Sequence, residues 1–248
     1  MLLYGVALVP LADLLLAEVP ELPQPFYADD ASMVGAPKDI AKAMSILLDA
    51  GPARGYYPEP EKSYLIGGPP ADTEDANVLS EFQFRNVDGF RYLGGFIGAV
   101  DDQSKWVEKQ VKAWVEGVKL LSQAAKRYPQ AAYAGLSKSL QSEWQYLQRS
   151  TPGISHLFQP LEDVIQNEFL PALLGGTAEE AKRLRKQLAL PVKLGGLAIL
   201  DPCESAERCH IASLECTKLL TSSLVQCCNL CVRTHRTVVN NARITSRE

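Results

Sequence analysis

The sequence predicts an α+β fold, with short strands and helices over residues 1–102 and a mainly α-helical region after them. Two observations predict this division. Short apolar runs closed by glycine or proline mark the first part, whereas apolar residues at a helical period follow Gln103. The charge changes at the same place: residues 1–102 carry 16 acidic and 6 basic side chains, and residues 103–248 carry 13 acidic and 19 basic ones. We therefore expect two regions of opposite charge.

The composition is that of a folded protein. Of 248 residues, 46% are hydrophobic and 22% charged, which excludes a disordered or collagen-like chain. The apolar stretch at 2–16 is shorter than the ~20 residues of a membrane span, lacks the basic start of a signal peptide and contains Pro10 and Asp13. All six cysteines follow residue 202, which indicates reduced thiols rather than a secreted disulfide scaffold. We expect a soluble intracellular protein with no membrane partner, in either nucleus or cytoplasm.

Local patterns predict the elements of the acidic region. Residues 2–17 are apolar on almost every side, as in a central buried helix, and this helix begins without an N-cap residue. Two short apolar runs joined by Asp29-Asp30 predict a β-hairpin over residues 26–34. The remaining expected elements are an amphipathic helix over 39–50, a strand over 62–66, a loop over 67–77 and a strand pair over 90–97 interrupted by Gly94-Gly95.

Helices dominate the rest of the chain. Residues 103–149 predict helix and carry eight Lys or Arg against three Glu. A helical hairpin is expected over 161–174 and 177–190, with Thr177 and Glu180 as a capping box. The last expected elements are a glycine-containing turn over 190–197, a cysteine-rich helix from 202 to about 230, and a frayed basic tail.

Adjacent carboxylates at Asp29-Asp30 are the sharpest local feature. Two negative charges this close repel unless a cation lies beside them, and Mg²⁺ favours carboxylate oxygens together with substrate phosphates. The alternative is ordinary turn chemistry, because Asp hydrogen-bonds its own backbone and tolerates turn dihedral angles. The dipeptide by itself favours the turn.

Several motifs, in order along the chain, resemble those of the reverse transcriptases of non-LTR retrotransposons. Phe26-Tyr27-Ala28-Asp29-Asp30 resembles motif C, the aromatic-x-Asp-Asp box of a palm hairpin, and the residues from Leu2 onward resemble the helix after motif B. Residues 55–63 are similar to motif D, residues 91–98 to motif E, and residues 190–201 to a Leu-Pro…Gly-Gly-Leu segment found after the palm. The resemblance covers roughly residues 1–202.

The resemblance implies template-directed nucleotidyl transfer by two metal ions. It implies that Asp29 coordinates a catalytic Mg²⁺, that Asp30 completes or supports the same metal site, and that Lys62 acts near the incoming triphosphate. An RNA template and a DNA primer are the implied partners. Glu59 departs from the family, which usually has Asn three residues before the lysine, and a solvated strand-edge lysine is the alternative for Lys62. The implied primer grip is the turn of Tyr92, Leu93, Gly94 and Gly95.

The resemblance also implies an organisation. Residues 1–102 correspond to a partial palm of short antiparallel strands with helices, 103–150 to a basic helical thumb, 151–232 to a helical connection with a cysteine-rich end, and 233–248 to a basic flexible tail. Motif A and the fingers precede motif B in the family, so we expect a fragment that is inactive alone. We also expect an open palm edge that favours self-association, with inadequate cover for Tyr4, Leu8, Leu11 and Leu15.

A row of lysines is the second candidate site. Lys105, Lys109 and Lys112 share one helical face at i, i+4 and i+7, and a thumb contacts duplex phosphates through such side chains. A solvated face of an amphipathic helix is an equal alternative. Trp106 and Trp114 lie on another face of the same helix. For both tryptophans, a position in the hydrophobic core is the favoured interpretation.

The cysteine-rich end has two interpretations. Cys228-x-x-Cys231 has half of a zinc-ribbon spacing, but no second close pair follows at a defined distance. Neighbouring leucines favour buried structural thiols instead. The ligand candidates for zinc are Cys203, Cys209, His210, Cys216, Cys227, Cys228 and Cys231.

Three functions stay open for the whole chain. They are a polymerase fragment, a non-catalytic module that binds nucleic acid or another chain, and a helical interaction protein with no nucleic-acid role.

Overall fold

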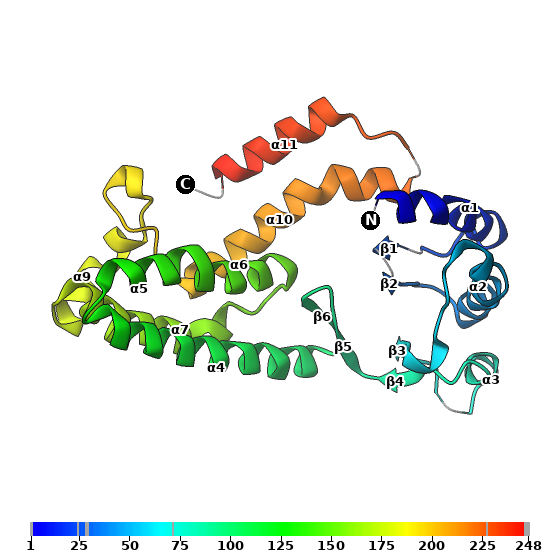
Figure 1. The fold of residues 1–248 in the computed structure, drawn as a ribbon, viewed down its shortest axis with the longest axis horizontal. Helices are drawn as coiled ribbons and strands as arrows, with labels where there is room; N and C mark the ends of the chain where they lie inside the picture. Colours follow the sequence, from blue (N-terminus) through cyan, green and yellow to red (C-terminus); the bar gives the residue numbers. More distant parts are fainter. Residues whose placement is uncertain (1, 24, 28–29, 71, 227, 246–248) are drawn as a thin grey trace. The chain divides into compact units, whose positions relative to one another are not determined.

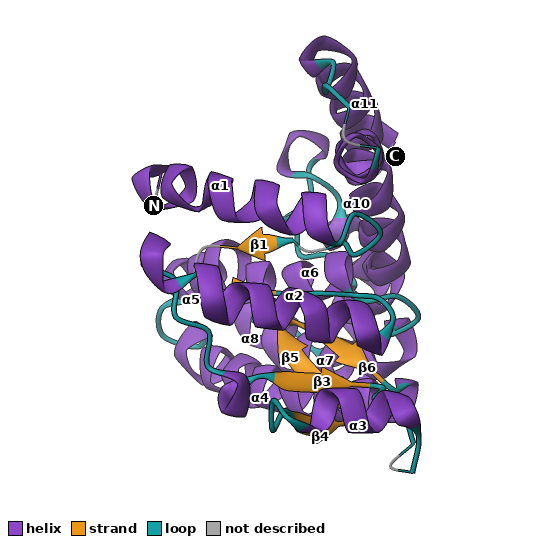
Figure 2. Cartoon of the chain, turned by 90° about the vertical axis from the view of Figure 1, so that its right-hand side faces the viewer, coloured by secondary structure: helices purple, strands orange, loops and turns teal. Residues whose placement is uncertain are grey.

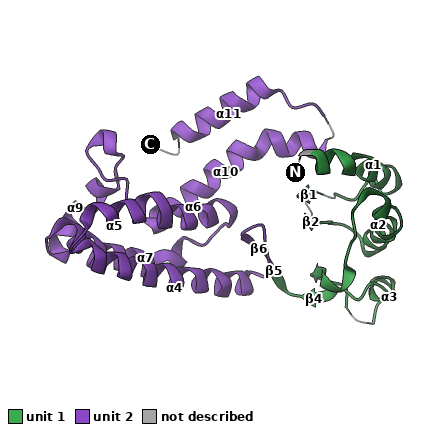
Figure 3. Cartoon of the chain, in the orientation of Figure 1, with its two compact units in different colours: residues 1–90 green, residues 91–248 purple. Residues whose placement is uncertain are grey.

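Helices and short strands follow one another along the chain (Figure 1). The structure, a computed structural model, describes residues 2–23, 25–27, 30–70, 72–226 and 228–245. In these residues the strands are two to four residues long and form three two-stranded sheets, while helices make up most of the rest. The predicted α+β class is therefore confirmed. The chain divides into unit 1, residues 1–90, and unit 2, residues 91–248 (Figure 3).

The core of unit 1 lies between α1 (Leu2–Glu18) and α2 (Pro37–Ala50), which pack side by side (Figure 2). The expectation that the α1 side chains lack cover is wrong. Leu8, Leu11 and Leu15 are at most 6% exposed, because Leu47 of α2 and other apolar residues pack against them, and Tyr4 is half-buried at the same cluster. The opposite face of α1 keeps exposed apolar side chains, among them Leu3, Val6 and Leu16.

Unit 1 contains two small sheets of different kinds. β1 (Phe26–Tyr27) and β2 (Asp30–Ala31) are antiparallel, as predicted. β3 (Tyr64–Ile66) and β4 (Arg85–Val87) are parallel, which corrects the expectation of antiparallel strands alone. Parallel strands need a crossover connection, and α3 (Glu74–Ser80) supplies it where a loop was expected. Thr73 caps α3 by accepting a hydrogen bond from the amide of Ala76 at 3.2 Å.

The core of unit 2 forms around aromatic side chains of α4 (Val100–Ala125) and α6 (Gln141–Ser150). Trp114 and Trp144 meet edge to face with ring centres 6.2 Å apart. Trp114 is 8% exposed and Trp106 packs against the same cluster, so the interpretation of both tryptophans as core residues is confirmed. Other helical elements around this core are α5 (Pro129–Gly135), α7 (Gln159–Val164), α8 (Leu170–Leu174), the 3₁₀ turn Ser155–Phe158 and two π-helical turns, Leu136–Leu140 and Ile165–Phe169. Two later helices, Ala178–Ala189 and Pro202–Val225, also contribute buried residues to it.

The predicted capping box begins α9 (Ala178–Ala189). The Thr177 amide donates to Glu180 Oε2 at 2.8 Å, and the Glu180 amide donates to Thr177 Oγ1 at 3.3 Å. The predicted glycine turn follows, with a 3₁₀ turn over Val192–Leu194 and Gly195 at φ 83°. Both features were predictable because each rests on local chemistry.

The chain ends with two helices that lie alongside each other, α10 (Pro202–Val225) and α11 (Val232–Thr245) (Figure 1). The expectation of a frayed tail over 233–248 is wrong for the part up to Thr245. His235, Val238, Val239 and Ala242 are spaced as one helical face and are half-buried. Packing against α10 therefore stabilises α11, although the polar sequence of α11 does not by itself predict a packed helix. None of the helices in the described ranges has the length and apolar character of a membrane span.

Candidate functional site

The β1–β2 hairpin carries Asp30, one of the two predicted metal ligands. Its register pairs Phe26 with Ala31 and Tyr27 with Asp30. The Phe26 ring meets Tyr56 edge to face at 6.0 Å and so attaches the hairpin to the core of unit 1. Asp30 is exposed, and its carboxylate is one oxygen donor that suits Mg²⁺. Asp29, the other predicted ligand, lies outside the described residues.

Lys62 lies in a 3₁₀ turn, Pro60–Lys62, rather than in the strand expected over residues 62–66. Two prolines near this turn oppose the regular strand ladder, so β3 begins at Tyr64. The ammonium of Lys62 forms an ion pair with the carboxylate of Glu59, the residue that departs from motif D. No hydrogen bond or ion pair joins Lys62 to Asp30 within the described part of unit 1.

The predicted primer grip is the turn between β5 (Gly89–Tyr92) and β6 (Gly95–Gly98). Leu93 and Gly94 have φ values of 46° and 81°. The Tyr146 hydroxyl of α6 donates a hydrogen bond to the Leu93 carbonyl, and a Cβ added to Gly94 would lie 2.9 Å from the Tyr146 ring. Glycine is therefore needed at position 94 for both its backbone angle and its space.

The hairpin is also held to α4. Phe96 of β6 stacks on Trp106 with ring centres 5.7 Å apart. The two contacts, Phe96 with α4 and Leu93 with α6, fix the turn on helices of unit 2. Tyr146 is 53 residues from its partner, so nothing in the sequence near the turn pointed to this support.

The face of α4 that bears the lysine row is exposed to solvent and carries both positive and negative side chains. Lys105, Lys109 and Lys112 are all exposed. Lys105 Nζ lies 3.0 Å from Asp102 Oδ1, and this hydrogen bond, followed by the charge of Asp102, raises the pKa of Lys105. Lys109 and Lys112 have no ion pair with any described residue. Glu108 and Glu116 also lie exposed on the helix, beside the row.

The described cysteines are separate thiols. Cys203, Cys209 and Cys216 are half-buried, and Cys228 and Cys231 are exposed. Within the described residues, which leave out Cys227, no three His, Cys, Asp or Glu side chains come together as metal ligands. The preference for buried structural thiols therefore fits the first three cysteines better than the last two.

Side chains of α5 and α6 hydrogen-bond to the backbone of segment 197–202. This segment is the end of the Leu-Pro…Gly-Gly-Leu motif together with the residue after it. Tyr133 Oη donates to the Leu197 carbonyl at 2.8 Å, and Gln141 Nε2 donates to the Ala198 carbonyl at 3.1 Å. The amide of Leu200 in turn donates to Gln141 Oε1 at 3.2 Å. This irregular backbone is half-buried for most of its length, and the side chains satisfy the polar groups of Leu197, Ala198 and Leu200.

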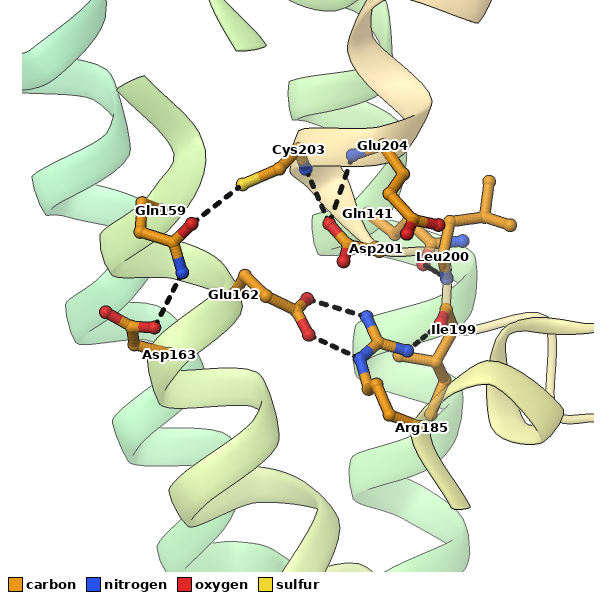
Figure 4. A network of polar contacts seen from close by, with 10 residues as sticks. All are labelled: Gln141, Gln159, Glu162, Asp163, Arg185, Ile199, Leu200, Asp201, Cys203 and Glu204. Atoms are coloured by element: carbon orange, nitrogen blue, oxygen red, sulfur yellow. Dashed lines mark hydrogen bonds and ion pairs between the residues drawn. The ribbon is translucent and has the colours of Figure 1, made fainter. Parts of the chain in front are cut away.

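A buried ion pair completes this region and was missed in the sequence (Figure 4). Arg185 of α9 donates from Nε and Nη2 to both oxygens of Glu162 at 2.5 and 2.7 Å, and from Nη1 to the Ile199 carbonyl at 2.7 Å. Burial raises the pKa of Glu162, while the hydrogen bonds and charge of Arg185 oppose that rise. A signal was present, because Arg185 shares the α9 face of buried Ala181 and Leu188.

Comparison of the chain with models of protein families, with curated proteins and with solved structures finds no match. The motifs and the geometry within each unit are therefore the features that bear on function.

Proposed function

We propose that this chain is part of an RNA-directed DNA polymerase of the non-LTR retrotransposon kind. The observation that carries the proposal is the register of β1 and β2, which pairs Tyr27 with Asp30 and leaves two residues between the strands. The aromatic residue and the second Asp of an aromatic-x-Asp-Asp sequence are thus paired across antiparallel strands, as the family resemblance implies. In intact members Mg²⁺ neutralises charge on the transferring phosphate. In this chain Asp30 offers an exposed carboxylate for that ion.

The turn of Leu93 and Gly94 supports the same proposal. A grip on a primer end needs a rigid turn, and Tyr146 and Trp106 hold this one from two helices. Leu93 is 41% exposed at the tip, so an apolar side chain is available to a nucleic-acid strand. The role proposed for the turn is to position the primer, with no chemical step of its own.

A non-catalytic role in nucleic-acid binding is the second candidate. The ion pair between Lys62 and Glu59 favours it, because a neighbouring carboxylate competes with a triphosphate for the same ammonium group. The exposed lysines of α4 fit either candidate. Binding of a duplex is therefore the activity that both candidates share.

Duplex binding is tested with a labelled RNA–DNA primer–template and the full chain. We expect binding that weakens steeply with salt, because each phosphate contact releases counterions. Changing Lys105, Lys109 and Lys112 together to Glu should weaken binding by about a hundredfold or more at low salt and lower the salt slope by about 3, roughly one unit for each lost contact. Fluorescence anisotropy over a salt series measures both quantities.

A matched triple variant on α9 serves as the control for net charge. Lys182, Arg183 and Lys186 are exposed, and their change to Glu alters the net charge by the same amount. The control should keep most of the affinity. Equal losses in the two variants, or no binding by the unsubstituted chain at low ionic strength, would refute the proposed interface.

We expect no primer extension by the 248-residue chain alone. Two-metal transfer uses carboxylates on both sides of the metal pair, and the resemblance assigns only Asp29 and Asp30 within these residues. A gel assay with RNA template, DNA primer, deoxynucleotides and Mg²⁺ measures extension directly. Mg²⁺-dependent incorporation that is lost in Asp29→Ala would contradict this expectation and place complete catalysis in the chain.

A further inference from the structure

The connection between α10 and α11 carries two exposed cysteines that the proposed function does not use. Cys228 and Cys231 are three residues apart, and Cys231 directly precedes Val232, the first residue of α11. A CxxC spacing is typical of pairs of thiols that form an internal disulfide. The pair is therefore a candidate for chemistry of its own.

Cys231 lies where a thiolate is stabilised. Thr234 Oγ1 donates a hydrogen bond to its Sγ at 3.1 Å. That hydrogen bond, together with backbone amide hydrogen bonds of Thr234 and Arg233, lowers the pKa of the Cys231 thiol. Because the thiolate is the nucleophilic form, Cys231 is the more reactive member of the pair.

The half-buried cysteines differ in this respect. Burial, with the neighbouring charges of Asp201 and Glu162, raises the pKa of Cys203 to about 12. Burial also raises the pKa of Cys209. The Sγ of Cys216 lies on the α11 side of α10, 4.0 Å from the Val239 carbonyl. The exposed Cys231, whose thiol has a lowered pKa, thus differs from the half-buried Cys203, Cys209 and Cys216.

We propose that Cys228 and Cys231 form a redox-active dithiol that reacts with small anionic disulfides. Arg233 and Arg236 are exposed in the first turns of α11, two and five residues after Cys231 in the chain. Their positive charge attracts a disulfide that carries carboxylates. Glutathione disulfide has this chemistry and is the probe for the test.

The reaction proceeds in two exchanges. The Cys231 thiolate attacks one sulfur of glutathione disulfide, whose S–S bond breaks, and a glutathione thiolate leaves and takes up a proton. The Cys228 thiol then loses its proton and attacks Cys231 Sγ, which releases the second glutathione thiolate. Two protein thiols are oxidised to one disulfide, and one glutathione disulfide is reduced to two thiols.

Mass spectrometry of the full chain during exposure to glutathione disulfide tests the proposal. We expect an internal Cys228–Cys231 disulfide that excess reduced glutathione reverses. In Cys228→Ser the mixed disulfide should accumulate on Cys231, and in Cys231→Ser the reaction of Cys228 should be roughly tenfold slower, because it lacks the stabilised thiolate. The internal disulfide should still form in Cys227→Ser.

The pH dependence of alkylation tests the part played by Thr234. Thr234→Val should raise the midpoint pH for reaction of Cys231 with iodoacetamide. Thr237→Val is the matched control, because its hydroxyl donates to the Arg233 carbonyl at 3.1 Å and not to the sulfur. It should leave the midpoint unchanged.

Four results would overturn the proposal. The first is an equal alkylation rate for Cys231 and Cys209. The second is a mixed disulfide that persists on Cys231 in the unsubstituted chain. The third is the absence of an internal disulfide in Cys227→Ser. The fourth is stoichiometric Zn²⁺ that protects both thiols in the purified chain, which would assign a metal site instead.

Discussion

Arg185→Met should lower the free energy of unfolding by about 3–5 kcal/mol, the range for breaking a buried ion pair on one side. Arg185 and Glu162 are 7% and 5% exposed, so the variant leaves a carboxylate without a partner in the interior. It also removes the donor to the Ile199 carbonyl. Urea unfolding followed by circular dichroism measures the change.

The loss of stability in Arg185→Met should depend on pH, and the ionisation of Glu162 determines in which direction it changes. Removing Arg185 takes away the hydrogen bonds and the charge that lower the pKa of this carboxyl, so its pKa rises further in the variant. A carboxyl whose pKa is raised in the folded state contributes stability at low pH and loses it as pH rises through that value. The variant should therefore be closest to the unsubstituted chain near pH 4 and furthest from it above pH 7.

Two further variants separate the charge from the loss of packing. The double variant Glu162→Leu with Arg185→Met should recover most of the stability, because it removes both buried charges. Arg183→Met, on the exposed side of the same helix, should change stability by less than about 0.5 kcal/mol. A loss that is independent of pH, or that the double variant does not reduce, would show that the ion pair is not its cause.

Gly196→Ala should lower the free energy of unfolding by about 3 kcal/mol, the upper end for overpacking. A Cβ at this position would overlap the Leu190 carbonyl and lie 2.7 Å from the Gln187 carbonyl oxygen. These are backbone atoms, so relief requires the turn to open. The opening would strain the hydrogen bonds from Leu197 and Ile199 to the Leu188 carbonyl.

Gly195→Ala is the control for this turn. Gly195 has φ 83°, and nothing lies within 4 Å of its added Cβ. Only backbone strain acts there, and the expected loss is about 1–2 kcal/mol. Thermal unfolding of the two variants compares them. Equal losses would refute the close approach at Gly196.

Local signals were enough for several elements. The α2 helix was predictable because Pro37 and its apolar period lie within 14 residues. The Thr177–Glu180 capping box and the β1–β2 hairpin likewise need only neighbours in the chain. The ion pair of Lys62 with Glu59 spans three residues and was predictable, because Glu59 stands three residues before the lysine where motif D usually has Asn.

Distant contacts were not predictable from these patterns. The parallel pairing of β3 and β4 depends on a crossover through α3, and Thr73 was not recognised as its cap. The support of Leu93 by Tyr146 joins residues 53 apart. α11 was missed because its own sequence is polar, and only packing against α10 reveals which side is apolar.

The sequence by itself determined the class of fold, the order of most helices and the positions of the glycine turns, because periodicity, caps and backbone angles act over a few residues. Only the tertiary structure decided which charges are buried. Arg185 and Glu162 are 23 residues apart, and packing of their helices removes both from water. It also decided which thiols are accessible, since burial separates Cys203 and Cys209 from exposed Cys231. Burial is a property of the assembled helices, and no single stretch of sequence contains it.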